Sequence, residues 1–202
     1  MGITHVVYDM DGLLLDTERF YTQVTQTIVG RYGHTFDWSL KSRMIGKKAI
    51  DSARILVEAL NLPIAPEEYL REREAHLDAL FPTVEPMPGA RRLTAHLARH
   101  GIPQAVASSS RRRDFELKVS RHKEWFACFE CVVLGDDPEV TRGKPEPDIF
   151  LEAARRIGVP PPRCRAYEDT DLGMQAIRAA GMEAVDVRKL LVKDSRGVRS
   201  GI

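Results

Sequence analysis

Residues 4–12 read THVVYDMDG, a short apolar run that ends in two acids and a glycine. The run is rich in β-branched side chains, which predicts a buried strand over residues 4–8. Asp9, Asp11 and Gly12 therefore come at the carboxyl end of that strand. Ligands of open α/β sheets bind at this end of the strands, so the stretch predicts both a fold and the position of a site.

Four further apolar runs have the same character. Segments with helical periodicity separate them, as at residues 88–100 and 171–180, where Gly181 follows as a helix stop. Strands that alternate with helices predict an α/β fold with a Rossmann-like, doubly wound parallel sheet. The four additional strands are expected at residues 104–107 (QAVA), 131–134 (CVVL), 164–167 (CRAY) and 183–187 (EAVDV).

The interval between the first two strands is long and contains no convincing strand. Amphipathic stretches occur in it at residues 21–28, 50–60 and 69–80. Because a structureless connection of this length would be unusual in a compact domain, we expect an inserted α-helical cap domain over residues 17–85. Residues 1–16 and 86–202 would then form the core. The polar, basic segment after Val187 is expected to be a frayed tail.

Composition excludes several classes of function. The 30 Lys and Arg residues balance 29 Asp and Glu residues, so no net field attracts nucleic acid or an anionic membrane. The apolar run near Met1 is too short for a signal peptide or a membrane span, which favours a cytoplasmic protein, and we expect a monomer. Cys128 and Cys131 form a C-x-x-C pair, but Cys131 opens an apolar run, so packing thiols are favoured over a zinc or redox site.

Polar residues follow three of the other predicted strands. Serines 108–110 follow the second strand, Lys144 lies in the loop after the third, and Glu168 and Asp169 follow the fourth. Clustered carboxylates repel one another unless a cation lies among them, and Mg²⁺ prefers such oxygen ligands. With the charge of Lys144 and the hydroxyl of Ser108, the set suits phosphoryl transfer. Each residue alone could be a helix cap, a turn former or a surface charge. Because all of them follow strands at the same edge of the predicted sheet, a shared site is favoured.

Four motifs in this order resemble the haloacid dehalogenase superfamily over almost the whole chain. They are DMDG at residues 9–12, Ser108, Lys144 within GKPEPD, and EDTDLG at residues 168–173. Within the superfamily, VVLGDDPEVTRGKPEPDIF at residues 132–150 is most similar to the pseudouridine-5'-phosphatase-like branch. The chain departs from the pattern at residues 111–113, where three arginines replace the small residues that are expected.

The resemblance implies roles for the acids. Asp9 would be the nucleophile that forms an aspartyl phosphate, and Asp11 the general acid and later the base. Magnesium would be held by Asp9, by the backbone carbonyl of Asp11 and by Asp169, with Glu168 close by or in an outer shell. Lys144 would pair with Asp9 and hold the transferring phosphoryl group.

The resemblance also implies the substrate contacts. Ser108, Ser109 and Gly12 would contact the phosphoryl group beside Lys144. From the cap, Glu18 and Lys47 are the candidates that would read the leaving group.

The expected function is that of a magnesium-dependent phosphoric monoester hydrolase acting on a small phosphorylated metabolite. Pseudouridine 5'-phosphate or a similar nucleotide or sugar phosphate is the expected substrate. A fructose 1-phosphate type of sugar phosphatase is one alternative. A β-phosphoglucomutase-like mutase is another, but residues 16–21 (DTERFY) lack the histidine associated with those mutases. A non-catalytic phosphate-binding protein is the least favoured.

Overall fold

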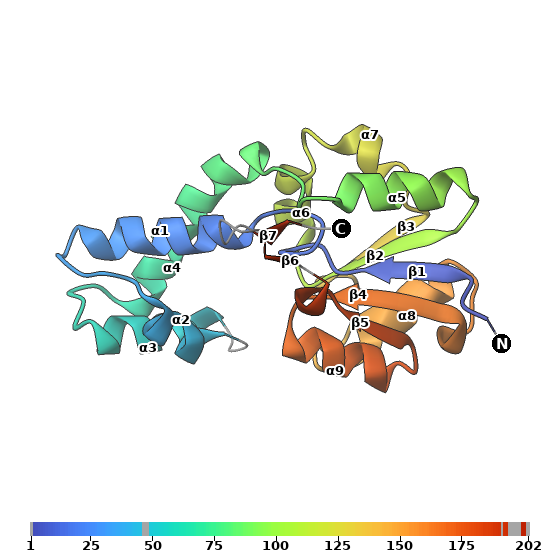
Figure 1. The fold of residues 1–202 in the computed structure, drawn as a ribbon. Coiled ribbons are helices and arrows are strands. Elements are labelled where there is room, and N and C mark those ends of the chain that lie inside the picture. The colour runs from blue at the N-terminus through green and yellow to red at the C-terminus, as the bar shows by residue number, and fades with distance from the viewer. Residues whose placement is uncertain (1, 46–48, 191, 194–198, 201–202) are drawn as a thin grey trace. The chain divides into compact units, whose positions relative to one another are not determined.

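The chain forms two compact units. The computed structural model describes residues 2–45, 49–190, 192–193 and 199–200. One unit, the core, comprises Met1–Asp16 and Val84–Ile202, and the other, the helical cap, is Thr17–Thr83 (Figure 1). Each unit is described by itself below.

The core contains a five-stranded parallel sheet in the order β3-β2-β1-β4-β5. All five predicted strands are present, and the predicted α/β class is confirmed. Tyr8 lies level with Val106 on one side and Tyr167 on the other, so three strands end close together. The strands are β1 (His5–Tyr8), β2 (Gln104–Ser108), β3 (Cys131–Leu134), β4 (Cys164–Glu168) and β5 (Glu183–Asp186).

Helices cover both faces of this sheet (Figure 1). Side chains alternate along each strand, so Val7 and Ala105 face the helices α8 and α9, whereas Tyr8 faces the opposite layer. In that opposite layer the Tyr8 hydroxyl donates to Gln104 over 2.9 Å. The helices of the core are α5 (Ala90–Arg99), α6 (Arg112–Lys118), α7 (Lys123–Phe126), α8 (Asp148–Arg156) and α9 (Asp171–Ala179), with 3₁₀ turns at Pro161–Arg163 and Val187–Lys189.

The cap consists of helices with a small core of their own. The amphipathic stretches predicted at residues 21–28, 50–60 and 69–80 correspond to three of its helices, although the second of these helices ends at Ala59, one residue earlier than predicted. A further helix, α2, begins after Asp37, whose carboxylate accepts the N–H of Leu40 over 2.9 Å. The bounds are α1 (Glu18–Gly30), α2 (Trp38–Met44), α3 (Ala49–Ala59) and α4 (Pro66–Leu80), followed by a 3₁₀ turn at Phe81–Thr83.

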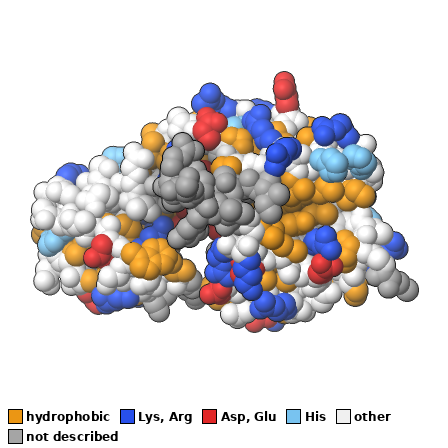
Figure 2. All heavy atoms as spheres, viewed as in Figure 1, with side chains coloured by type: hydrophobic (Ala, Val, Ile, Leu, Met, Phe, Trp, Pro, Cys, Tyr) orange, Lys and Arg blue, Asp and Glu red, His pale blue; other side chains and the backbone are white. Residues whose placement is uncertain are grey.

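Three further expectations concern the tail, the thiols and the surface. Val192–Lys193 and Arg199–Ser200 pair as short antiparallel strands, β6 and β7, where a frayed tail was expected, because pairing satisfies their backbone groups locally. All three cysteines are free thiols. On the face shown in Figure 2, basic and acidic side chains are interspersed. Among the described residues, no helix has the length and apolar character needed to span a bilayer.

Candidate active site

Asp9 lies at the end of β1 and is almost completely buried. Its N–H donates to the carbonyl of Tyr167 over 3.0 Å, which extends the pairing of β1 with β4 and fixes the backbone of Asp9 at the sheet edge. The ammonium of Lys144 donates to Oδ1 of Asp9 over 2.5 Å. Burial raises the pKa of Asp9 to about 7, while the charge of Lys144 acts in the opposite direction. Burial therefore disfavours the ionised form of Asp9, and the positive charge of Lys144 favours it.

Lys144 joins two acids that come from different strands. Besides Asp9, it donates to Oε2 of Glu168 over 2.7 Å. Although burial disfavours its charge, the carboxylates of Asp9 and Glu168 raise the pKa of Lys144, so it remains an ammonium ion. The loop that carries Lys144 is anchored by Asp148, which accepts the hydroxyl of Thr141 over 2.8 Å and the N–H of Arg142 over 3.0 Å.

Glu168, the last residue of β4, is fixed by four hydrogen bonds. Its Oε1 accepts the N–H groups of Asp169 and Thr170 and the hydroxyl of Thr170, over 3.1, 3.0 and 2.8 Å. Its Oε2 accepts Lys144. Glu168 is only 1% exposed. Both of its oxygens are thus occupied by donors within the protein, which makes it a support for the site.

The acids provide a suitable place for a divalent cation. One carboxylate oxygen each of Asp9, Glu168 and Asp169 lies within 4.8 Å of the others. Hard cations such as Mg²⁺ take oxygen ligands of this kind. Because Glu168 is already engaged by four donors, the carboxylates of Asp9 and Asp169 fit direct contact with a cation better. Three of the four acids predicted to gather lie together here, whereas the carboxylate of Asp11 is bound by other partners. The donor set of the three acids fits the predicted metal.

Gly173, in the first turn of α9, lies against Glu168. A Cβ atom added at Gly173 would come 2.0 Å from both Cδ and Oε2 of Glu168. No carbon can occupy that position without displacement of the glutamate or of the helix start. The glycine that ends the EDTDLG motif therefore allows β4 and α9 to approach closely around Glu168.

We expect Gly173→Ala to reduce both stability and activity. The methyl group must displace Glu168, and Glu168 in turn holds Lys144; overpacking of this kind costs about 1–3 kcal/mol. Urea unfolding and phosphate release measure the two effects. Gly30→Ala in α1 is the control, since its Cβ would meet only Nε2 of Gln26 at 3.4 Å. Wild-type stability and turnover for Gly173→Ala would contradict the proposed support by Glu168.

Asp11 points to a different set of partners, at the end of β2. Its Oδ2 accepts the hydroxyls of Ser110 over 2.7 Å and Ser108 over 3.3 Å. Its Oδ1 accepts the ammonium of Lys118 over 2.6 Å. Sequence reasoning missed Lys118. The available signal was its position three residues after Phe115, on the side of α6 that carries apolar residues.

The structure brings most of the predicted site residues to one edge of the core. Ser108 is buried, and its Oγ also accepts the N–H of Ser110 over 3.1 Å. Ser109 is exposed. Gly12 has a φ of 82°, and its N–H already donates to the carbonyl of Leu15 over 2.9 Å, so its amide is engaged in the turn.

The sequence also predicted two candidate contacts from the cap, Glu18 and Lys47. Glu18 belongs to the cap unit, where its carboxylate accepts Lys41 over 3.2 Å. Lys47 lies outside the described residues.

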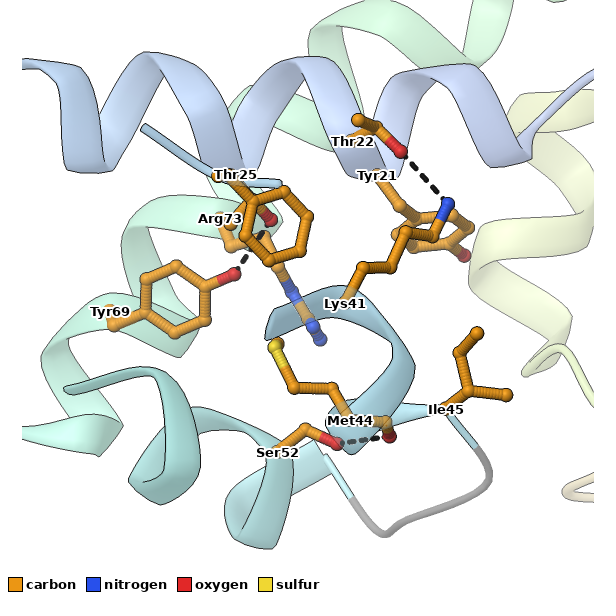
Figure 3. A pocket seen from close by; sticks show the side chains of 10 residues that line it. Tyr21, Thr22, Thr25, Lys41, Met44, Ile45, Ser52, Tyr69 and Arg73 are labelled. Carbon is orange, nitrogen blue, oxygen red and sulfur yellow. Dashed lines mark hydrogen bonds between the residues drawn. The ribbon is translucent and has the colours of Figure 1, made fainter. Parts of the chain in front are cut away.

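The cap contains a pocket of about 150 Å³. Figure 3 shows Lys41, Arg73 and Tyr69 around it, and the hydroxyls of Tyr69 and Thr25 form a hydrogen bond over 2.9 Å. Met44 and other apolar side chains complete the wall. Within the described residues, the buried Nε atom of Arg73 has no hydrogen-bond partner. The pocket therefore combines cationic groups with apolar walls.

Comparison with known proteins identifies the family. The family model of the haloacid dehalogenase-like hydrolases matches residues 3–181. The chain belongs to this family. The resemblance predicted from the DMDG, GKPEPD and EDTDLG motifs is thereby confirmed.

Relatives of this hydrolase include named phosphatases. It is 49% identical to (DL)-glycerol-3-phosphatase 1, mitochondrial, from Arabidopsis thaliana, over 96% of this chain and 65% of the relative. It is 45% identical to a probable pseudouridine-5'-phosphatase from Drosophila melanogaster, over 92% of this chain and 81% of the relative. A crystal structure of a HAD family hydrolase from Deinococcus radiodurans, with bound phosphate and sodium, has a TM-score of 0.75 and 28% identity, over 90% of this chain and 79% of that one.

These likenesses confirm the predicted architecture and support the predicted enzyme class. The doubly wound core with an inserted helical cap is the architecture of the family. The enzyme class, phosphoric monoester hydrolase, is supported at the level of the family, since the relatives above are named as phosphatases. The hydrolase spans 65% of the length of the first relative, so its own substrate is argued separately below.

Proposed function

We propose that this hydrolase is a magnesium-dependent phosphatase that cleaves a small phosphomonoester through an aspartyl phosphate on Asp9. The observation that supports the proposal is the buried Asp9 carboxylate at the sheet edge, 2.5 Å from Lys144. The acids Glu168 and Asp169 lie beside it. A nucleophile, a fixed positive charge and a place for a cation are the parts that phosphoryl transfer requires.

In the first half of the proposed reaction, a carboxylate oxygen of Asp9 attacks the phosphorus atom. The bond between phosphorus and the leaving oxygen breaks, and Asp11 donates a proton to that oxygen so that it departs as an alcohol. Lys144 and the hydroxyl of Ser108 hold the oxygens of the transferring group. Ser109 remains a further candidate for this contact.

In the second half, a water molecule attacks the phosphorus of the aspartyl phosphate. Asp11, now a carboxylate, takes a proton from this water, and the Asp9 carboxylate is regenerated as inorganic phosphate leaves. Bound Mg²⁺ would neutralise charge on the phosphoryl oxygens, and Asp9, Asp169 and the carbonyl of Asp11 would hold it, with Glu168 as their support.

Asp11→Asn should reduce turnover of an alkyl phosphate on the order of 10²- to 10⁴-fold, the range for general acid–base groups. The amide keeps the shape of the side chain but cannot supply the proton. The first half-reaction of p-nitrophenyl phosphate should suffer much less, because nitrophenolate leaves without protonation. Burst kinetics separate that step from hydrolysis of the intermediate. A near-normal rate with the alkyl phosphate would remove this role from Asp11.

The proposed substrate is a small polyol, nucleoside or sugar monophosphate. Relatives named for glycerol 3-phosphate and for pseudouridine 5'-phosphate are similarly close, at 49% and 45% identity. Glycerol 3-phosphate, which is not among the substrates expected from the sequence, joins the candidates. We propose that the cap selects the leaving group, with Glu18 and Lys47 as candidate contacts and the cationic pocket around Lys41 and Arg73 as a further source of selectivity.

The test is phosphate release from a panel of monophosphates with and without Mg²⁺. The panel contains glycerol 3-phosphate, pseudouridine 5'-phosphate, uridine 5'-phosphate, fructose 1-phosphate and glucose phosphates. Magnesium-dependent release from one class supports the proposal and names the substrate. Transfer within a sugar phosphate without net release, dependent on a sugar bisphosphate, would show a mutase. No release from any compound would favour a phosphate-binding protein. The cytoplasmic location and the monomeric state stay predictions.

A further inference from the structure

A second buried lysine contacts the other acid of the DMDG motif. Lys118 is the last residue of α6, and its side chain is only 1% exposed. Its ammonium donates to Oδ1 of Asp11 over 2.6 Å and to the hydroxyl of Ser110 over 2.7 Å. The reaction proposed above makes no use of Lys118 or Ser110, so their contact with the general acid requires an explanation.

The contacts hold both carboxylate oxygens of Asp11. Lys118 binds Oδ1, and Ser110 donates to Oδ2 over 2.7 Å while accepting Lys118 through the same hydroxyl. The three side chains thus form a closed ring, and Ser108 adds a longer bond of 3.3 Å to Oδ2. A carboxylate held through both oxygens cannot change its rotamer without breaking these bonds. The ring therefore fixes the direction in which Asp11 points.

The two acids of the motif have separate cations. Asp9 is bound by Lys144, which also contacts Glu168, whereas Asp11 is bound by Lys118. Carboxylates two residues apart repel each other, and each ion pair draws its acid toward a different strand end, β4 or β2. The nucleophile and the proton donor are in this way kept apart and individually oriented.

The simpler explanation is that the ion pair only stabilises the fold. The energetics of buried ion pairs argue against this explanation. Desolvation of two charges offsets most of their attraction, so a buried ion pair adds little stability compared with apolar packing. The orientation of a reacting group, in contrast, is a sensitive quantity: a displacement of about 1 Å can cost on the order of 10²-fold in rate. The orientation of Asp11 therefore explains the presence of a buried lysine better than a net gain in stability does.

We infer that Lys118 and Ser110 are positioning residues, which hold the Asp11 side chain in the orientation for proton transfer: its protonated form gives the proton to the leaving oxygen, and its carboxylate form then takes one from the attacking water. This inference rests on the proposed function, since it takes Asp11 as the general acid. Neither residue touches the reacting phosphoryl group in this account. Both act through Asp11.

The test uses Lys118→Met with two substrates, glycerol 3-phosphate and p-nitrophenyl phosphate. With the alkyl phosphate, kcat should fall about 10- to 100-fold while KM changes less than about twofold. With the aryl phosphate, the burst rate should change less than about threefold, because that leaving group needs no proton. An equal loss with both substrates would show a structural role and overturn the inference. Lys123→Met, at an exposed lysine of α7, is the matched control.

Ser110→Ala gives an independent measurement that also serves if Lys118→Met does not fold. It preserves the pair of Lys118 and Asp11 but opens the ring, so we expect the same selectivity for the alkyl phosphate with a smaller loss, about 3- to 10-fold. Wild-type kinetics for Ser110→Ala, with Lys118→Met either unfolded or unselective, would overturn the inference.

A double-mutant cycle separates this inference from the proposed function. In an Asp11→Asn background, Lys118→Met should add less than about twofold to the loss with the alkyl phosphate, because the residue it positions is already inactive. Full additivity would overturn the positioning role. If Asp11→Asn alone leaves alkyl turnover unchanged, the proposed function itself fails. If Asp11→Asn is slow while Lys118→Met and Ser110→Ala both match the wild type, only the positioning role fails.

Discussion

Asp9→Asn should abolish turnover, with a loss on the order of 10⁵-fold or more, as expected when the nucleophile of a covalent mechanism is removed. The amide has nearly the same volume as the carboxylate but does not attack phosphorus. The fold should survive, because Lys144 keeps its second partner, Glu168, at 2.7 Å. Phosphate release measures the activity, and far-ultraviolet circular dichroism with thermal unfolding measures the fold.

Two additional measurements make this expectation decisive. Acid quenching of the wild-type enzyme during turnover should trap phosphate on the protein, and the Asp9→Asn variant should trap none. Asp37→Asn is the control, because Asp37 caps α2 and asparagine caps a helix equally well. Substantial hydrolysis by Asp9→Asn, or equal trapping by both proteins, would exclude the aspartyl phosphate on Asp9.

Lys144→Met should cost both activity and stability. Loss of a preorganised charge at the transferring group typically reduces kcat on the order of 10²- to 10³-fold. Removal of one partner from a buried ion pair costs about 3–5 kcal/mol in the free energy of unfolding, because the remaining charges are left uncompensated. Here the uncompensated groups are Asp9 and Glu168. Urea unfolding measures the stability, and a chelator in the solution prevents a metal ion from replacing the lost charge.

The double variant Asp9→Asn with Lys144→Met tests the cause of that destabilisation. If repulsion between the acids is responsible, neutralising Asp9 should restore part of the lost stability, with a coupling of about 1 kcal/mol or more. Activity should remain absent. Lys123→Met is again the control for loss of a lysine. A double variant less stable than Lys144→Met alone would argue that packing, rather than charge, makes Lys144 important.

The strands and their positions along the chain could be predicted because the signal is local. The five apolar runs predicted as strands form β1 to β5, with ends within one residue of the expected positions. Helix α2 was missed because it is short, at 7 residues, and begins within a polar segment, where periodicity gives little information. Its start depends on a single capping residue, Asp37.

Candidate catalytic groups could also be predicted, because the acids and Lys144 occupy positions next to strand ends. What the motifs could not show is how each group is held. Glu168 was expected near the metal, and the structure shows that four donors already engage it. Gly12 was expected to contact substrate, and its N–H is engaged by Leu15. Hydrogen-bond partners are set by three-dimensional proximity, which a linear pattern records only in part.

By itself, the sequence determined the class of fold, the order of its elements and the edge of the sheet where the acids gather, because alternation along strands and the direction of parallel strands follow from local pattern. Only the tertiary structure decided which cation serves which acid. Lys118 and Asp11 are 107 positions apart and Lys144 and Asp9 are 135 apart. Such pairs form because folding brings α6 and the loop after β3 to the same edge, where burial favours charges that are paired.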